Sequence, residues 1–311
     1  MFEKIYFFFR DLLYVVKYSK NYLSNRYFLS DIKYNEYHFK NSFGYKPDIN
    51  NPKTLNEKII WLKIFHKNRN YKKYVDKFLV RKYIENKIGS KYLIPLLAVY
   101  DNSKYLNYNF LKSNLPLVIK TNHGSGDFAL IKNKYDINLM KLKLFFRNAQ
   151  KRNLDIEKKQ YQYSGIEKKI LVEKMLLNDN KSIPSDFKVH CFNGEPEFIY
   201  VTTGRGTTKI YRGVYDLNWI PLEFCWSKKI KGKFEYKFDN NVKKPKNLKK
   251  IIELARKIAG DFSDTYVRVD FYNKNNGTIY FGEITFHHMS GFAPIEPKIY
   301  DINFGKKLKI S

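Results

Sequence analysis

The chain has 311 residues, 43% of them hydrophobic, and a formal net charge of +28 from 58 Lys and Arg against 30 Asp and Glu. This length can bury a core as one large or two modest domains, while two isolated cysteines, Cys191 and Cys225, argue against a disulfide framework or a structural zinc site and favour a reducing compartment. The charge predicts attraction to polyanions without choosing one, and a nucleotide bias towards Lys, Asn, Ile, Tyr and Phe codons explains much of it equally well.

The first predicted element is an amphipathic helix from Phe2 to Val16, whose apolar side chains share one broad face. Arg10 and Asp11 split its apolar run, which falls short of the roughly 20 residues of a membrane span and lacks the layout of a signal peptide. We expect the helix either to lie in the interface of an anionic membrane or to pack on the protein. Residues 1–50 are expected to form this helix and a linker.

Helices and strands follow in the rest of the chain. Thr54, with Glu57 three residues later, forms a capping box that predicts a helix start, and two further helices are expected over Tyr71–Asn86 and Pro245–Gly260. Pro95 favours an edge strand or a loop within Tyr92–Tyr100. Asn-Gly turns predict two later hairpins. The other predicted strands are Leu115–Lys120, Phe128–Ile131, Ile170–Glu173, Phe187–Phe192, Glu197–Thr202, Tyr266–Tyr272 and Thr278–Ile284.

The most informative residues are two carboxylates on the last hairpin. Asp270 and Glu283 can project from one face of neighbouring strands, where cross-strand side chains lie about 5 Å apart. Carboxylates so close repel each other unless a cation lies between them, and Mg²⁺ binds carboxylate oxygens together with nucleotide phosphates. Val269 and Phe271 predict a buried sheet, where an unpaired carboxylate is costly, so a solvated acidic hairpin is the weaker interpretation.

Three further segments could bind phosphate or adenine, although each is ambiguous alone. Lys120 precedes the loop His123–Gly126, whose backbone N–H groups could approach a phosphate. The loop matches neither a Walker A motif nor Gly-x-Gly-x-x-Gly, so an ordinary tight turn explains it equally well. Glu173 ends a predicted strand. It could accept a hydrogen bond from an adenine amino group, or it could be the end of an ordinary strand. Lys188 alternates with apolar residues, as either a solvent-facing lysine or a phosphate ligand.

The order of these motifs resembles the ATP-grasp superfamily, most closely its TupA-like branch, from about Asn51 to Lys307. The segments that carry the resemblance are Asn51–Lys58, Tyr92–Leu97, Lys120–Gly126, Cys191–Pro196, Val267–Asp270 and Gly282–Phe286. It implies an α+β ATP-grasp fold over residues 51–311, with an N-terminal helical part and a small antiparallel clamp subdomain at about 90–175. A C-terminal mixed sheet at about 176–311 would carry the metal-binding hairpin.

The resemblance also implies roles for single residues. Lys120 and Lys188 would hold the phosphates of ATP beneath a glycine-loop lid, and the segment that begins at Glu173 would face adenine. Arg268 would stabilise the oxyanion of a tetrahedral intermediate, with Lys188 beside it in catalysis. The residues assigned to ATP are Arg81, with Lys77 as second candidate, Lys120, Gly124, Ser125, Gly126, Glu173, Lys174, Met175, Leu176 and Lys188. Those assigned to Mg²⁺ are Asp270, Glu283 and Thr285.

Two departures from the family pattern stand near the hairpin. Thr285 replaces the Asn that commonly serves as a third metal ligand, and because a hydroxyl binds Mg²⁺ more weakly, a protein that binds nucleotide without turnover stays an alternative. His287 and His288 replace an expected Pro-Gly turn. Adjacent strand residues point to opposite faces, so at most one of these histidines is expected in the site.

The implied function is ATP-dependent ligation of a carboxylate to an amine through an acylphosphate, in bacterial surface polysaccharide biosynthesis such as that of a capsule or teichuronopeptide-like polymer. The implied partners are ATP, Mg²⁺, an acidic or lipid-linked glycan acceptor and an amino acid or other amine, in the cytoplasm and peripherally at the anionic inner membrane face. A glycosyltransferase is the first alternative, although no Asp-x-Asp motif is present. A basic, aromatic-rich nucleic-acid binder is the second, but no recognised module supports a specific nucleic acid.

Overall fold

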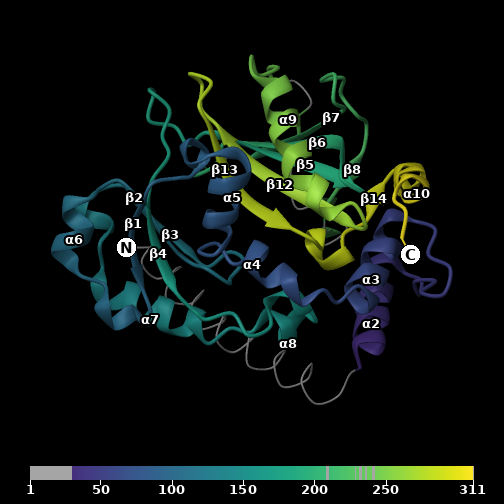
Figure 1. The fold of residues 1–311 in the computed structure, drawn as a ribbon, viewed down its shortest axis with the longest axis horizontal. Helices are drawn as coiled ribbons and strands as arrows, with labels where there is room; N and C mark the ends of the chain where they lie inside the picture. The colour runs from purple at the N-terminus through teal and green to yellow at the C-terminus, as the bar shows by residue number, and fades with distance from the viewer. Residues whose placement is uncertain are drawn as a thin grey trace. The chain divides into compact units, whose positions relative to one another are not determined.

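The computed structural model describes residues 30–207, 210–227, 229–230, 233–234, 237–239 and 242–310. The expected helix Phe2–Val16 lies outside these residues. The described chain forms two compact units (Figure 1), the first from residues 30–34, 69–78 and 95–175, and the second from residues 35–68, 79–94 and 176–310. Within the described ranges, no helix has both the length and the apolarity needed to cross a membrane.

The first unit is built on a four-stranded antiparallel sheet. Its strand order is β1 (Leu96–Tyr100), β4 (Ile170–Lys174), β2 (Leu117–Thr121) and β3 (Phe128–Ile131). The predicted pairing of the strands around the glycine loop is confirmed, and β1 lies at an edge, as Pro95 favoured. The other elements are η1 (Arg69–Tyr71), α4 (Lys72–Val75), η3 (Ser103–Tyr105), α6 (Tyr108–Ser113), η4 (Lys134–Asp136), α7 (Leu139–Gln150), α8 (Leu154–Lys158) and η5 (Tyr161–Tyr163).

One face of this sheet is apolar and the other carries charge. Ile119 and Val172 are fully buried and belong to a cluster with Phe146 of α7. Because side chains alternate along a strand, Lys120 and Glu173 project from the opposite face.

Helix prediction was wrong at one place and incomplete at another. The single helix expected over Tyr71–Asn86 is interrupted at Asp76, which is extended (φ −71°, ψ 112°), and α5 (Val80–Ile88) begins after it. The buried Asp76 carboxylate accepts hydrogen bonds from the Phe78 N–H and from Asn122 Nδ2, and these bonds compete with a continuous helix. Residues 31–43, within the expected linker, form α2 (Asp31–Phe43), with Phe39 fully buried.

The second unit contains a six-stranded mixed sheet. Its order is β11 (Lys237–Phe238), β7 (Tyr211–Tyr215), β6 (Glu195–Thr203), β5 (Ser185–Phe192), β12 (Tyr266–Asn273) and β13 (Ile279–Thr285), with only the β11–β7 pair parallel. Both predicted hairpins are confirmed. Asn193 (φ 49°) and Gly194 (φ 89°) both take the left-handed conformation that a tight two-residue turn requires.

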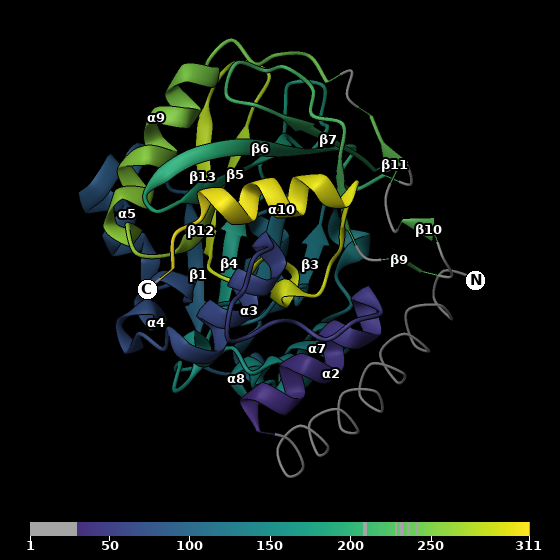
Figure 2. The ribbon, with the colours of Figure 1, turned by 90° about the vertical axis from the view of Figure 1, so that its right-hand side faces the viewer.

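Helices cover the two faces of this sheet differently. Helix α9 (Leu248–Ala259) packs through a wholly apolar buried stripe on β5, β6 and β12 (Figure 2). On the other face, α3 (Leu55–Phe65) and α10 (Lys298–Lys307) lie side by side and join an apolar cluster with Phe198 and Trp226. The remaining elements of the unit are η2 (Ser90–Tyr92), β8 (Cys225–Trp226), β9 (Lys229–Ile230), β10 (Lys233–Phe234), η6 (Gly260–Phe262), η7 (His288–Gly291) and β14 (Ile295–Glu296).

Helix α3 begins as the capping box predicts. The Glu57 N–H donates to Thr54 Oγ1 at 3.2 Å, and the Thr54 N–H donates to Glu57 Oε2 at 3.0 Å. Asp301 of α10 then accepts hydrogen bonds from Asn56 through its backbone N–H (3.0 Å) and Nδ2 (3.1 Å). A carboxylate therefore stands at the positive end of α3, which favours the contact between the two helices.

Asp301 is expected to make stability depend on pH. Burial raises its pKa to about 6, above the value of about 3.9 in an unfolded chain. Between these values the folded state binds more protons than the unfolded state, so the free energy of unfolding should fall by about 2 kcal/mol as pH rises from 4 to 6. Urea unfolding across this range should show that slope, and Asp301→Asn should flatten it. An equally steep slope in the variant would assign the effect to another group.

Candidate functional site

In the first unit, basic side chains hold the glycine loop after β2. Lys77 Nζ donates to the Gly124 carbonyl at 2.7 Å, and Arg152 Nη1 donates to the Ser125 carbonyl at 3.2 Å. Arg152 also forms a buried ion pair with Asp127 at 2.6 Å. The loop is thus fixed through its carbonyl groups by two cations from other parts of the unit.

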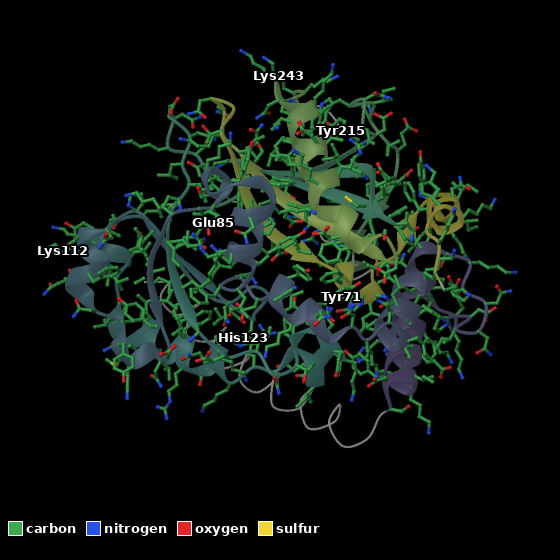
Figure 3. The ribbon with its side chains drawn as sticks, viewed as in Figure 1. Tyr71, Glu85, Lys112, His123, Tyr215 and Lys243 are labelled. Atoms are coloured by element: carbon green, nitrogen blue, oxygen red, sulfur yellow. The ribbon has the colours of Figure 1, made fainter. Side chains whose placement is uncertain are left out.

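His123 precedes Gly124 in the same loop and is labelled in Figure 3. Its Nδ1 lies 3.1 Å from Asn122 Oδ1. Burial, assisted by the charge of Lys168, lowers the pKa of His123 to about 4, so the ring is neutral at physiological pH. The positive charge around the loop therefore comes from lysine and arginine side chains.

Gly124 has no room for a side chain, because a Cβ there would lie 2.0 Å from Asp127 Oδ2 and 2.3 Å from Thr121 Oγ1. Gly124→Ala is expected to displace the loop at a cost of about 1–3 kcal/mol. If the loop binds ATP, affinity should fall about tenfold or more. Isothermal titration with MgATP checks this, with Gly260→Ala as a matched control, since a Cβ at Gly260 meets nothing within 4 Å. Equal affinities in the two variants would remove the loop from the nucleotide site.

Lys120 and Glu173 meet on the charged face of the first sheet. Lys120 Nζ lies 2.6 Å from Glu173 Oε2, and the Glu173 side chain is only 5% exposed. Beyond Glu173, the N–H groups of Lys174 and Met175 donate to the carbonyls of Pro95 and Pro116, at 3.0 and 3.1 Å. Those two N–H groups are therefore engaged within the sheet and are not available to adenine.

The two candidates for the phosphate-binding helix residue lie in different units. Lys77, of the first unit, contacts the glycine loop directly. Arg81 belongs to α5 of the second unit, where its Nη2 donates to the Ile94 carbonyl at 2.9 Å. The structure thus gives Lys77, the second candidate, the contact with the loop.

In the second unit, strand register gathers the predicted catalytic and metal residues on one face. Asp270 of β12 lies opposite Lys188 of β5 and Glu283 of β13. Arg268 Nη2 donates to Asp270 Oδ2 at 2.6 Å and to Glu283 Oε1 at 2.7 Å, and Lys188 Nζ donates to Asp270 Oδ2 at 2.9 Å. The expected juxtaposition of the two carboxylates is confirmed, and a guanidinium group joins them.

Two adjacent rows of cross-strand neighbours describe this face. The central row consists of Glu283, Asp270, Lys188 and Tyr200, and the distal row consists of Tyr272, Asp186, Thr202 and Arg212. The central row runs from β13 to β6, and the distal row runs from β12 to β7. The predicted metal residues Asp270 and Glu283 lie at the β12–β13 end of the face, and Lys188 follows on β5.

Sequence reasoning missed Asp186 and Arg205. Asp186 Oδ2 accepts hydrogen bonds from Lys188 Nζ at 2.6 Å and from Arg205 Nη2 at 2.5 Å. Burial would raise the pKa of Asp186, but the two cations hold it well below its usual range. Two sequence signals could have found the pair. Asp186 precedes Lys188 by two residues at the start of a predicted strand, which places both on one face, and Arg205 stands between two glycines, Gly204 and Gly206.

A left-handed turn places His288 against Arg268. Met289 and Ser290 have φ values of 49° and 59°, which are uncommon for residues with side chains. Arg268 Nη1 lies 2.8 Å from His288 Nδ1. Arginine only donates, so Nδ1 accepts, and burial, with the charge of Arg268, holds the pKa of His288 well below its ordinary value. The neutral ring therefore carries its proton on Nε2.

Adjacent His287 lies in a different environment, as the alternation argument expects. Burial and the nearby charge of Lys63 lower the pKa of His287 to about 3. Only His288, of the two, is bonded to the Arg268 guanidinium.

The donor set of the hairpin fits Mg²⁺ in its chemistry. Asp270 and Glu283 supply carboxylate oxygens that already bind one cationic group, and Thr285 adds a hydroxyl, which donates to Glu283 Oε1 at 3.2 Å. Hard oxygen donors of this kind are the ligands that Mg²⁺ prefers. Within the described residues, no group of three or more His, Cys, Asp or Glu side chains is arranged to hold a metal.

The chain has distant similarity to solved ligase structures. An ADP complex of N5-carboxyaminoimidazole ribonucleotide synthetase matches at 13% identity and a TM-score of 0.41, over 69% of this chain and 45% of that one. D-alanine–D-alanine ligase from Bacillus anthracis matches at 15% identity and a TM-score of 0.38, over 68% of this chain and 56% of that one. An L-amino acid ligase from Bacillus licheniformis matches at 11% identity and a TM-score of 0.41, over 74% of this chain and 44% of that one. The chain thus covers about half the length of these proteins.

Comparison with curated proteins finds no match. A family model does match the chain, over residues 57–309, and its description is TupA-like ATP-grasp. The match includes both sheets and every residue assigned above to ATP, Mg²⁺ or catalysis. The chain therefore belongs to the TupA-like ATP-grasp family, as the order of its motifs suggested.

Proposed function

We propose that the protein is an ATP-dependent ligase that joins a carboxylate to an amine. The observation that carries this proposal is the buried Arg268 guanidinium, which joins Asp270 and Glu283 beside Lys188. Phosphoryl transfer needs such an arrangement, with carboxylates for a metal ion and cations for the phosphoryl oxygens. Membership of the ATP-grasp family supports ATP as the nucleotide.

The proposed reaction has two steps. An oxygen of the acceptor carboxylate attacks the γ-phosphorus of ATP, and the bond from that phosphorus to the bridging oxygen breaks. The products of this step are ADP and an acylphosphate. The amine nitrogen then attacks the acyl carbon, and the carbon–oxygen bond to phosphate breaks. The products of this step are phosphate and an amide. The nitrogen loses one proton to solvent, and no covalent intermediate forms on the enzyme.

The residues of the second unit would stabilise the charge that moves in these steps. Lys188 and Arg268 would bind the transferring phosphoryl group, and Arg268 would bind the oxyanion formed when the amine attacks. A bound Mg²⁺ held by Asp270, Glu283 and Thr285 would neutralise phosphate charge. His288 would position Arg268, because its Nδ1 accepts a hydrogen bond from Nη1.

The residues of the first unit would bind the nucleotide. Lys120 would contact its phosphates, and Glu173 would accept a hydrogen bond from the adenine amino group. The ion pair between these side chains places both on the charged face of the sheet. Lys77 would support the glycine loop through the Gly124 carbonyl.

For partners, we propose an acidic or lipid-linked glycan as acceptor and an amino acid or other amine as donor, in the synthesis or modification of a surface polysaccharide. The net charge of +28 supports an acidic acceptor, since a strong positive field raises the local concentration of a polyanion. The same field would favour peripheral contact with an anionic membrane.

Product analysis tests this function. Purified protein would be incubated with MgATP, uronic-acid oligosaccharides and amino acids, and ADP, phosphate and product mass would be measured. Release of ADP and phosphate, with a mass gain equal to the amine minus water, is the expected result. If ATP neither binds nor turns over while a nucleotide sugar is consumed, the protein is a glycosyltransferase instead. ATP binding without turnover across the panel would indicate a nucleotide-binding protein without ligase activity.

A further inference from the structure

We propose that the distal row, together with Arg205, forms an anion subsite for a second negatively charged group of the acceptor. This group would be a carboxylate or phosphate that stays intact while another carboxylate of the same molecule reacts. The inference rests on the proposed ligase function and narrows its substrate class to acceptors with at least two anionic groups.

Strand pairing places Thr202 between a basic and an acidic side chain. Its neighbour on one side is Arg212, and its neighbour on the other is Asp186, which accepts a hydrogen bond from Arg205. The Arg212 guanidinium carbon lies 5.6 Å from the centre of the Tyr200 ring, so this side chain extends over the sheet towards the central row. Arg212 is therefore the cross-strand neighbour of Thr202 on the polar face, and Arg205 contacts the Asp186 carboxylate on the other side of Thr202.

The distal row holds one acidic and one basic side chain, Asp186 and Arg212, and two cations outside the row contact its acid. Asp186 is the one carboxylate of the distal row, and it already accepts hydrogen bonds from both Lys188 and Arg205. In the central row, Asp270 is bonded to Arg268 and Lys188. Beside β7, the backbone N–H of Asp239 donates to the Arg212 carbonyl at 2.8 Å. Arg212 therefore adds a further positive charge to a row whose single acid has two cationic partners.

Two buried polar atoms point to a ligand here. Thr202 is 1% exposed, and its Oγ1 has no hydrogen-bond partner among the residues that the structure describes. The same holds, within those residues, for Nε of Arg205, which can only donate. A buried polar group left without a partner costs about 1–3 kcal/mol. A ligand that accepts hydrogen bonds from both groups would remove this cost, and an oxyanion is such a ligand.

The spacing of strands assigns this anion to the acceptor and not to the nucleotide. Arg212 lies on β7, two strands from Lys188 on β5 and three from Asp270 on β12. At about 4.8 Å per strand, its backbone is roughly 10 Å from that of Lys188 and roughly 14 Å from that of Asp270. Thr202 on β6 is one strand from Lys188 and two strands, roughly 10 Å, from Asp270, so a phosphoryl group held beside Asp270 would lie away from the Thr202–Arg212 pair. The acceptor would then present a second anion roughly 10 Å from its reacting carboxylate, as a short acidic glycan can.

Binding measurements with matched variants test the subsite. Wild type and variants, each saturated with MgADP, would be titrated with tetragalacturonate, inorganic pyrophosphate and neutral cellotetraose. Arg212→Gln is expected to weaken binding of the anionic probe at least tenfold, and Thr202→Val about threefold, while MgATP affinity stays at the wild-type value. Arg256→Gln is the charge-matched control, because Arg256 lies on α9 and pairs with Glu195 at the surface; it should bind as wild type does.

Thr202→Val distinguishes a specific anion site from general electrostatic attraction to a basic protein, because the substitution removes a hydroxyl group and no charge. Selective loss of tetragalacturonate binding would identify a sugar carboxylate as the bound group, and selective loss of pyrophosphate binding would identify a carrier phosphate. If wild type binds neither anion, or if Arg212→Gln and Thr202→Val bind both as tightly as wild type does, the proposal is wrong. Absence of MgATP binding by wild type would instead overturn the proposed ligase function.

Discussion

Asp270→Asn is expected to lower ATP turnover about 1,000-fold or more. Asp270 accepts hydrogen bonds from both Arg268 and Lys188, and it is a proposed metal ligand beside Glu283. An amide at this position keeps the size of the side chain but removes its charge. The variant should therefore lose metal affinity while Arg268 and Lys188 lose the anion that orients them. The measurement is ADP release at increasing Mg²⁺ concentration, where the variant should need more metal for its residual rate.

The control for this prediction is Glu253→Gln, which also neutralises one carboxylate. Glu253 is exposed on α9, where it pairs with Lys250 and Lys257, and exposed pairs of this kind contribute little to stability. Its turnover should equal that of wild type. A rate for Asp270→Asn within tenfold of wild type, with unchanged Mg²⁺ dependence, would remove Asp270 from the metal site.

Arg268→Met is expected to lower the free energy of unfolding by about 3–5 kcal/mol. The guanidinium group is buried and bonded to Asp270, Glu283 and His288. Methionine is long and apolar, so the site stays filled while the Asp270 carboxylate keeps only Lys188 as a cationic partner. The cost comes mainly from that buried, under-compensated charge.

Urea unfolding of a double-mutant cycle checks this account. If the cost comes from the uncompensated charge, Arg268→Met combined with Asp270→Asn should be more stable than the sum of the single variants predicts, by about 0.5–3 kcal/mol. Arg256→Met, at an exposed ion pair with Glu195, should change stability by less than about 1 kcal/mol. Additive effects at Arg268 and Asp270 would show that their contact does not carry the stability.

The sequence was most informative where structure depends on neighbours along the chain. The capping box at Thr54 and the tight turn at Asn193–Gly194 are local, and both are confirmed. The cross-strand pairing of Asp270 and Glu283 also depends on local sequence, because a short turn and the two-residue period of a strand set the register of a hairpin. Family membership was likewise predictable, since the order of the motifs is a property of the chain alone.

Helix boundaries were less predictable because distant contacts override local preference. The predicted helix over Tyr71–Asn86 has suitable periodicity, yet Asp76 leaves the helical conformation to accept a hydrogen bond from Asn122, 46 residues away. The polar segment 31–43 carries a weak helical signal, yet it forms α2 with Phe39 buried. In both places, tertiary burial and hydrogen bonding contribute more than intrinsic propensity.

The sequence by itself determined the family, most of the strands, both hairpins and the face shared by Asp270 and Glu283. Only the tertiary structure decided that Arg268 joins these carboxylates, that His288 bonds Arg268 across a left-handed turn, and that Arg205 reaches Asp186. The physical reason is the distance along the chain. Strand β5 pairs with β12 across about 80 residues, and such pairing is stabilised by burial of the whole sheet, which no short sequence pattern records.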